Sequence, residues 1–245
     1  MASRTGALKA GLLTGLPETL LKLIFPPRCL LCRAVLAPGT ERPLCSRCRP
    51  RFIPGGIVCP QCGLVARRVK SCSCAEGATP LQGLFALSWY EGEWRQMLLR
   101  LKFAGRRQLA RPLGHWLGRE LAAETAWPVA AVVPLPMYRQ KEALRGYNQA
   151  ELIARAAAHE LGLPLVRLLK KTRHTASQTG LSLQERKRNV TGAFAVCRPL
   201  PPGRAVLLVD DIYSTGATMG EAALALQRSG LVVYGAVAAY NPRLH

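Results

Sequence analysis

The chain has 245 residues, of which 49% are hydrophobic and 20% are charged, a composition ordinary for about one or two domains folded around a core. Lysine and arginine outnumber the acidic residues by 34 to 14, which gives a formal net charge of +20. This excess excludes no fold, because net charge governs association. It favours an anionic partner: a nucleic acid, a phosphorylated metabolite or an acidic membrane surface. The alternative is a solvated, arginine-rich surface with no dedicated partner.

Within the N-terminal segment 1–25, residues 5–25 form an apolar stretch that three charged residues interrupt: Lys9, Glu18 and Lys22. Its longest uncharged stretch is shorter than the roughly 20 residues of a membrane-spanning helix. It also lacks a signal-peptide core followed by a small-residue cleavage site. We therefore expect a short amphipathic helix here, no transmembrane segment, and a cytoplasmic protein.

The next part of the chain, residues 26–78, contains eight of the nine cysteines, arranged as three C-x-x-C pairs and one C-x-C pair. Two such pairs offer four thiolates to one ion, which is the ligand set of a closed, structural zinc site. Disulfides are the alternative, but they need an oxidising compartment and no export signal is present. The simplest assignment of two Zn²⁺ ions is sequential, and the spacing also allows a cross-braced one. The sequential sets are Cys29, Cys32, Cys45 and Cys48, then Cys59, Cys62, Cys72 and Cys74.

The ninth cysteine, Cys197, stands alone at the end of an expected strand. An isolated thiol in such a place behaves as a small hydrophobic side chain. We therefore expect Cys197 to be buried.

From about residue 80 onward, expected strands and helices alternate, and the strands are continuous apolar runs. This pattern is typical of a parallel sheet with helices on both faces. In such folds ligands bind at the carboxyl ends of the strands. The expected strands are 84–90, 130–136, 163–169, 193–196, 205–209 and 232–240, and the expected helices lie near 94–101, 109–123, 148–161 and 217–229.

The helix expected at 148–161 has a recognisable start. Asn148 suits the N-cap position, and Glu151 three residues later would complete a capping-box-like pair.

The stretch "VLLVDDIYSTGAT" ends an apolar strand in the chain's only two aspartates, Asp210 and Asp211. A loop of small and hydroxyl-bearing residues follows and enters a helix. Free N–H groups, hydroxyls and the helix dipole together cradle a phosphate. The carboxylates suit the hydroxyls of an attached sugar, or its Mg²⁺. The pattern therefore predicts a ribose 5-phosphate site, whose phosphate loop is Ser214, Thr215, Gly216, Ala217 and Thr218.

This stretch resembles the motif with which type I phosphoribosyltransferases bind 5-phosphoribosyl 1-pyrophosphate (PRPP), although Tyr213 replaces the usual aliphatic residue. The whole chain after residue 24 resembles the ComF family of DNA-uptake competence proteins. The resemblance extends through "FPPRCLLC", "LKFAGR", "VPLP", "RGYNQAELIA" and "TASQTGLSLQERKRNVTGAF" to the aspartate motif. It implies an α/β fold: a type I phosphoribosyltransferase-like parallel sheet flanked by helices over residues 80–245, preceded by a double zinc-ribbon module over residues 26–78.

The resemblance also implies roles for individual residues. The two aspartates would contact ribose hydroxyls with Mg²⁺ nearby, and the loop 214–218 would hold the 5′-phosphate. Pro134, Leu135 and Pro136 would form the loop that receives pyrophosphate. Residues 170–189 would form a catalytic hood that neutralises the departing pyrophosphate, although a basic polar loop is often only solvated. The candidate catalytic residues of this hood are Lys171, Arg173, Arg186 and Arg188.

Two functions follow from these observations. The first is a Mg²⁺-dependent phosphoribosyltransferase that acts on PRPP in DNA uptake or nucleotide metabolism, with an acceptor that the sequence does not identify. The second is a non-catalytic competence factor that binds single-stranded DNA and other DNA-uptake proteins, with the same fold as a scaffold.

Overall fold

The computed structural model describes residues 26–37, 44–48, 52–65, 72, 74, 79–175, 183–198 and 200–242, apart from the side chains of 183, 184, 186 and 187. The chain divides into two compact units, Met1–Arg49 and Pro50–His245. The division places the two cysteine clusters in different units. The helix expected in residues 1–25 lies outside the described part of the chain. Among the described helices, none is both long and apolar enough to cross a membrane.

The first unit has little regular structure in its described residues. A turn follows Cys29, an isolated bridge joins Arg28 to Val35, and a short 3-10 helix, η1, spans Ser46–Cys48. Among its described residues, five hydrophobic side chains are buried, and two of them are cysteines. A set of this size does not hold a fold by itself without a disulfide or a metal. The five buried side chains are Cys29, Leu31, Leu36, Leu44 and Cys48.

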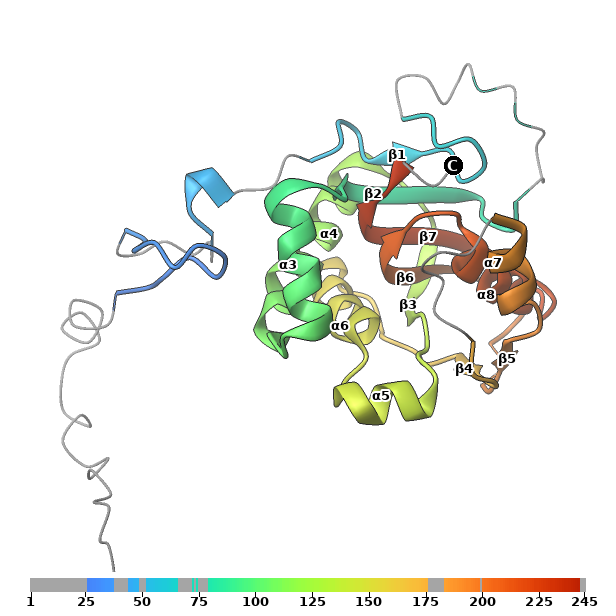
Figure 1. Ribbon diagram of the computed structural model, residues 1–245. Coiled ribbons are helices and arrows are strands. Elements are labelled where there is room, and N and C mark those ends of the chain that lie inside the picture. The colour runs from blue at the N-terminus through green and yellow to red at the C-terminus, as the bar shows by residue number, and fades with distance from the viewer. Residues whose placement is uncertain are drawn as a thin grey trace, which may run out of the picture. The chain divides into compact units, whose positions relative to one another are not determined.

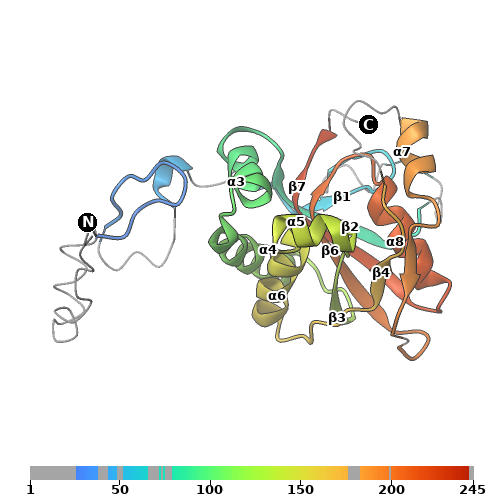
Figure 2. The same ribbon diagram turned by 60° about the horizontal axis from the view of Figure 1, so that its bottom comes forward.

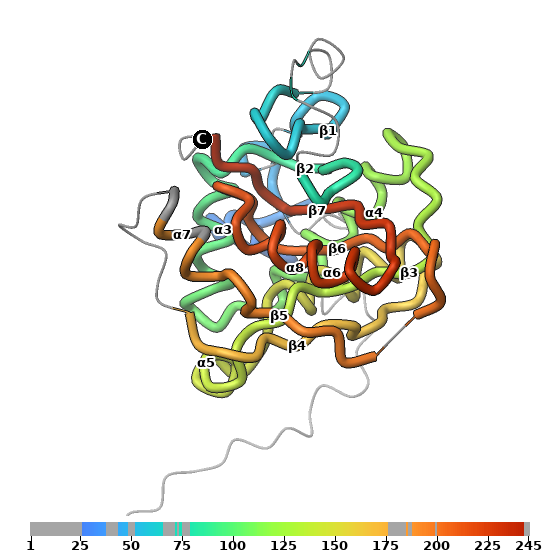
Figure 3. Tube along the Cα trace, turned by 90° about the vertical axis from the view of Figure 1, so that its right-hand side faces the viewer, coloured from blue at the N-terminus to red at the C-terminus, as the bar shows by residue number. Residues whose placement is uncertain are grey.

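The second unit is built on a five-stranded sheet with strand order β1-β2-β7-β6-β3. All neighbouring strands are parallel except β1, which pairs antiparallel with β2. Figure 3 shows β1, β2, β7 and β6 in this order from the top of the view. The prediction of a parallel sheet is confirmed. The strands are β1 (Ile57–Val58), β2 (Gly83–Trp89), β3 (Val129–Pro134), β6 (Ala205–Tyr213) and β7 (Val232–Tyr240).

Two of the expected strands form no ladder in this sheet. Of these, the segment 163–169 pairs with β3 through an isolated parallel bridge between Leu165 and Val132. β4 (Leu169–Lys171) and β5 (Phe194–Val196) pair antiparallel with each other and form a separate two-stranded sheet. Each has three residues, and only Leu169 and Phe194 among the six are buried. Short, half-exposed strands of this kind suit a small flap better than the interior of a parallel sheet.

Helices cover both faces of the main sheet. α3, α4 and α6 lie together on one face, and α8 lies on the other beside β5 and α7 (Figures 1 and 2). α4 and α6 approach closely at Gly114, where a Cβ atom would lie 2.2 Å from the carbonyl oxygen of Ile153. The helices are α3 (Gly92–Phe103), α4 (Ala110–Glu124), α5 (Arg139–Arg145), α6 (Gln149–Leu161), α7 (Leu183–Val190) and α8 (Ala217–Gln227), with a 3-10 turn η2 (Arg107–Leu109).

Candidate ligand site and metal centres

The aspartate pair lies inside strand β6, and not in a loop after residue 209 as the sequence suggested. The parallel ladder with β7 continues past the pair, with Asp210 opposite Val237 and Tyr213 opposite Tyr240. The strand is longer than its apolar run because β7 extends to Tyr240 and supplies backbone partners to the end. Successive side chains of a strand start toward opposite faces of the sheet, yet both carboxylates reach one cavity at the end of the strand.

Asp211 points to the face covered by α3 and forms an ion pair with Lys102. The Lys102 Nζ lies 2.8 Å from Asp211 Oδ2, and the Asp211 side chain is 4% exposed. Burial lowers the pKa of Lys102, but the charges of Asp211 and Asp210 outweigh it and leave the pKa above its usual value. Lys102 therefore stays cationic beneath the site. Sequence reasoning assigned it no role, although it belongs to the "LKFAGR" motif.

Asp210 points to the opposite face and lines the cavity described below. Its Oδ1 accepts a hydrogen bond of 2.8 Å from the Asp211 backbone amide. Burial, followed by the neighbouring charge of Asp211, raises the pKa of Asp210 well above its usual value. A cation or a sugar hydroxyl bound to this carboxylate would favour its charged form and offset part of the free-energy cost of burying the charge.

The phosphate loop is held in a conformation that requires glycine. Gly216 caps α8 with φ of 73°, and α8 begins at Ala217 as the sequence predicted. A Cβ atom at Gly216 would lie 2.2 Å from the Tyr213 hydroxyl oxygen. Both the left-handed backbone and the close contact therefore exclude a larger residue here.

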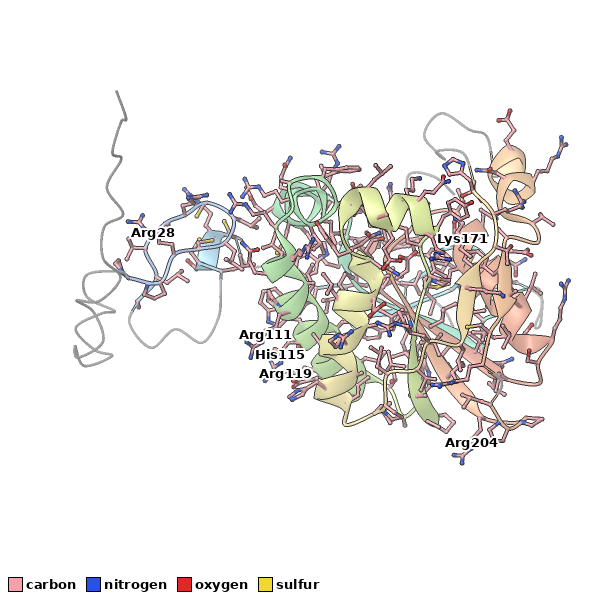
Figure 4. All side chains as sticks on the ribbon, turned by 90° about the horizontal axis from the view of Figure 1, so that it is seen from below. Arg28, Arg111, His115, Arg119, Lys171 and Arg204 are labelled. Carbon is pink, nitrogen blue, oxygen red and sulfur yellow. The ribbon has the colours of Figure 1, made fainter. Side chains whose placement is uncertain are left out.

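These elements surround a cavity of about 320 Å³. It brings together most of the predicted ligand-binding residues: both aspartates, the complete loop 214–218, Leu135, Pro136 and Lys171. Figure 4 shows Lys171 beside α5 and the two-stranded flap. Pro134 instead lines a neighbouring cavity of about 770 Å³ on the other side of the proline turn.

Two of the remaining hood candidates, Arg173 and Arg188, line neither cavity. Arg173 is exposed and donates a 2.6 Å hydrogen bond to the Thr191 carbonyl, and Arg188 is exposed on α7. The side chain of Arg186 lies outside the described part of the structure.

Helix α5 supplies two cationic side chains that sequence reasoning did not assign to the site. Lys141 and Arg145 line the smaller cavity with Lys102 and Lys171. Arg145 donates to the Gln149 side chain and lies over the Phe103 ring, 5.5 Å from its centroid. The cavity thus has four cationic side chains around two carboxylates, an arrangement suited to an anion with several charges.

Lys171 is fixed by its surroundings. Its Nζ donates a 2.8 Å hydrogen bond to Thr175 Oγ1 and lies 5.4 Å from the centroid of the Phe194 ring. Burial, then the charges of Lys141 and Arg173, lowers the pKa of Lys171, and Asp210 opposes them. An anionic ligand would favour its charged form.

The start of α6 ties the proline turn to the rest of the site. Asn148 is the N-cap as predicted, since its side chain accepts a 3.0 Å bond from the Ala150 amide. The same side chain donates a 2.9 Å bond to the Leu135 carbonyl. The predicted capping role of Glu151 is wrong: its carboxylate instead pairs with Arg155 and Arg167, two cations that compete successfully for it.

The cysteines form two groups of four, in the sequential assignment: Cys29, Cys32, Cys45 and Cys48, then Cys59, Cys62, Cys72 and Cys74. Within each group the sulfur atoms lie within 4.8 Å of one another. Zn–S bonds of about 2.3 Å in a tetrahedron place sulfurs roughly 3.8 Å apart. The Cys32–Cys45 and Cys59–Cys72 pairs, at 3.6 and 3.5 Å, are close to this value.

The local chemistry also suits a metal ion. A hydrogen bond from the Ala34 backbone, aided by neighbouring cysteines and opposed by burial, lowers the pKa of Cys32 to about 6. The Cys62 amide lies 3.5 Å from Cys59 Sγ, as in turns that present thiolates to zinc. All nine cysteines are free of disulfides. Both groups therefore fit structural Zn²⁺, with four protein ligands and no position for water.

Cys197 is exposed, and its predicted burial is wrong. It follows β5, whose short pairing with β4 leaves the flap open to solvent at this end. Its Sγ donates to the Leu168 carbonyl at 3.4 Å.

Comparisons with known proteins match both parts of the chain. The double zinc ribbon domain family matches residues 20–76. "DNA utilization protein YhgH" of Salmonella typhi is 33% identical over 215 residues, covering 85% of this chain and 94% of that protein. "Competence protein F" of Haemophilus influenzae is 30% identical, covering 84% and 93%. "Competence protein ComFC" of Bacillus subtilis is 26% identical, covering 82% and 89%. The chain therefore belongs to the ComF family of competence and DNA utilization proteins.

Proposed function

We propose that the protein binds PRPP, or a related ribose 5-phosphate, together with Mg²⁺ in the 320 Å³ cavity. The observation that carries the proposal is the meeting of three features in this cavity: the acid pair, a small hydroxyl-rich loop at a helix start, and four cationic side chains. Each feature suits one part of such a ligand. The loop 214–218 would bind the 5′-phosphate and Asp210 the ribose hydroxyls.

The cationic side chains suit the pyrophosphate group. Lys141, Arg145 and Lys171 line the same cavity as Leu135 and Pro136 of the proline turn. In a phosphoribosyl transfer, the bond from ribose C1 to pyrophosphate breaks and its electron pair leaves with pyrophosphate, while an acceptor bonds to C1. Fixed cations would stabilise the charge that develops on the leaving group. Bound Mg²⁺ would add positive charge at the same phosphates.

We place this activity in the handling of DNA taken up by the cell or in nucleotide metabolism, on the strength of what the relatives are called. The enzyme would be a phosphoribosyltransferase whose acceptor is undefined. Both cysteine groups would act structurally, through two Zn²⁺ ions. Other DNA-uptake proteins are the expected protein partners.

Calorimetric titration of PRPP and Mg²⁺ into zinc-loaded protein tests the proposal. Wild-type protein is expected to bind in the micromolar range. The Asp210→Asn/Asp211→Asn variant is expected to bind at least about 100-fold more weakly, because Asp210 would lose charge-assisted bonds to two ribose hydroxyls, each worth about 1.5–3 kcal/mol. The Glu93→Gln/Glu124→Gln variant removes two acids elsewhere and serves as the control. Absence of wild-type binding, or equal binding by both variants, would contradict the proposal.

A second candidate function is the binding of single-stranded DNA. It is favoured by the net charge of +20 and by a basic row on α4, formed by Arg111, His115 and Arg119. Figure 4 shows these three side chains gathered along one side of the helix. His115 also pairs with Glu160 at 2.6 Å. Helical spacing places successive members about 6 Å apart along the axis, comparable to successive phosphates of an extended strand.

Fluorescence anisotropy with a labelled oligonucleotide tests this candidate. The affinity of wild-type protein is expected to fall steeply with salt. The Arg111→Gln/Arg119→Gln variant should reduce the slope of log K against log salt by about 1.4, since each phosphate contact on a single strand contributes about 0.7. An Arg204→Gln/Arg228→Gln variant removes the same charge elsewhere. Salt-insensitive binding, or equal slopes in the two variants, would rule out the row as a DNA contact.

A further inference from the structure

Tyr213 ends strand β6 three positions before Gly216, the cap of α8. Its side chain is buried, and its ring lies against that of Tyr240, with centroids 6.2 Å apart. It is also the residue at which the stretch departs from the usual PRPP motif. An aliphatic side chain at this position would fill space but could form no hydrogen bond.

The hydroxyl of Tyr213 reaches the second cysteine group. It donates a 2.7 Å hydrogen bond to the carbonyl of Pro60, which lies within the Cys59–Cys62 turn. Strand β7 also contacts the Cys59–Cys62 turn, through Tyr240. A Cβ atom at Gly63, the residue after Cys62, would lie 1.9 Å from the Tyr240 hydroxyl oxygen. The turn that carries two of the four thiolates therefore rests on the ends of β6 and β7.

The same Tyr213 oxygen touches the phosphate loop from the other side. A Cβ atom at Gly216 would lie only 2.2 Å from it, so the loop backbone packs directly on the hydroxyl. One oxygen atom thus lies between the metal-binding turn and the loop at the N-terminus of α8. Because close-packed contacts transmit displacement, a shift of the turn would move this oxygen and the loop with it.

We propose that Tyr213 is a positioning residue that couples the second cysteine group to the phosphate loop, so that the metal ion in one favours the ligand in the other. The inference rests on the proposed binding of PRPP. Coupling between two sites is reciprocal. If the metal-loaded turn holds the loop in its binding conformation, bound ligand must in turn retain the metal.

The test measures zinc release to a chromogenic chelator from zinc-loaded protein, with and without PRPP and Mg²⁺. In wild-type protein, ligand is expected to slow the release of one of the two ions by about 5-fold or more, in the usual range of coupling energies. The Tyr213→Phe variant keeps the ring and removes the hydrogen bond. It should bind PRPP about 5- to 10-fold more weakly, the effect of one hydrogen bond, and its zinc release should not respond to ligand.

Two controls make the result specific. Tyr234→Phe alters a tyrosine of the neighbouring strand β7, whose ring stacks on Trp127, and should behave as wild type. The Asp210→Asn/Asp211→Asn variant, unable to hold the ligand, shows whether PRPP itself takes up zinc in solution. A purely structural role for Tyr213 would change stability but would not make zinc release depend on ligand.

The outcomes separate the two proposals. If wild-type protein binds PRPP but its zinc release ignores the ligand, the coupling is overturned and the proposed function stands. If wild-type protein does not bind PRPP, both are overturned. The wild-type comparison needs no variant, so it decides the question even if Tyr213→Phe fails to fold.

Discussion

Replacing Lys102 with methionine is expected to lower the free energy of unfolding by about 3–5 kcal/mol at pH 7, the usual cost of removing one partner of a buried ion pair. The substitution leaves the buried Asp211 carboxylate without its cation, next to Asp210, whose pKa burial already raises. Urea unfolding followed by circular dichroism measures the change. The charge of Lys102 opposes the burial that raises the pKa of Asp210, so its removal raises that pKa further, and the loss should be smaller at pH 5 than at pH 7.

Two further variants show whether the ion pair is the cause. The Lys102→Met/Asp211→Leu double variant removes both charges and should regain most of the lost stability, since apolar replacements of a buried pair are often neutral. Lys170→Met, at an exposed position of β4, should change stability by less than about 0.5 kcal/mol. If Lys102→Met lowers the free energy of unfolding by less than about 1 kcal/mol, the ion pair is solvated and contributes little to stability.

Replacing Cys29 and Cys32 with serine is expected to unfold the first unit while leaving the second intact. The described residues of the first unit bury five hydrophobic side chains, two of them cysteines, and such a set is too small to hold a fold together by itself. The binding of a structural zinc ion, worth about 10–16 kcal/mol in small zinc domains, would therefore supply its folding energy.

Elemental analysis should find about one zinc per chain in this variant against about two in wild type, as two four-cysteine sites require. Hydrogen exchange should show lost protection over residues 26–48 and unchanged protection in β2, β6 and β7. Cys197→Ser, which changes the exposed cysteine, is the control and should retain both ions. Persistent protection of the first unit without its zinc would show that other contacts hold it.

The features that the sequence predicted well are local. Apolar runs located the main strands, turn residues located the ends of α6 and α8, and paired cysteines located both metal groups. Each depends on residues that are near one another in the chain. Asn148 as a helix cap is an example, because its partner Ala150 is two positions away.

The features that the sequence did not predict depend on distant pairings. Nothing near Lys102 indicates that the end of α3 meets β6 at Asp211. Arg145 and Lys141 enter the site only because the turn after β3 brings α5 over it. Glu151 was misread for the same reason, since Arg167 approaches it from a later segment. Cys197 looked buried because its strand is apolar, whereas the flap that contains it is too small to cover it.

The strand order has a consequence for how the chain folds during synthesis. β2 lies between β1 and β7, so its only parallel neighbour is the last strand of the chain. The Cys59–Cys62 turn likewise lacks its hydrogen-bond partner until Tyr213 is synthesised, 153 residues after Pro60. At roughly 5–20 residues per second, a ribosome needs on the order of ten seconds or more to deliver these partners. Until then β2 lacks its parallel partner and can aggregate, and the thiols of the Cys59–Cys62 turn can be oxidised. Nascent chains should therefore depend on chaperones and on a prompt supply of zinc.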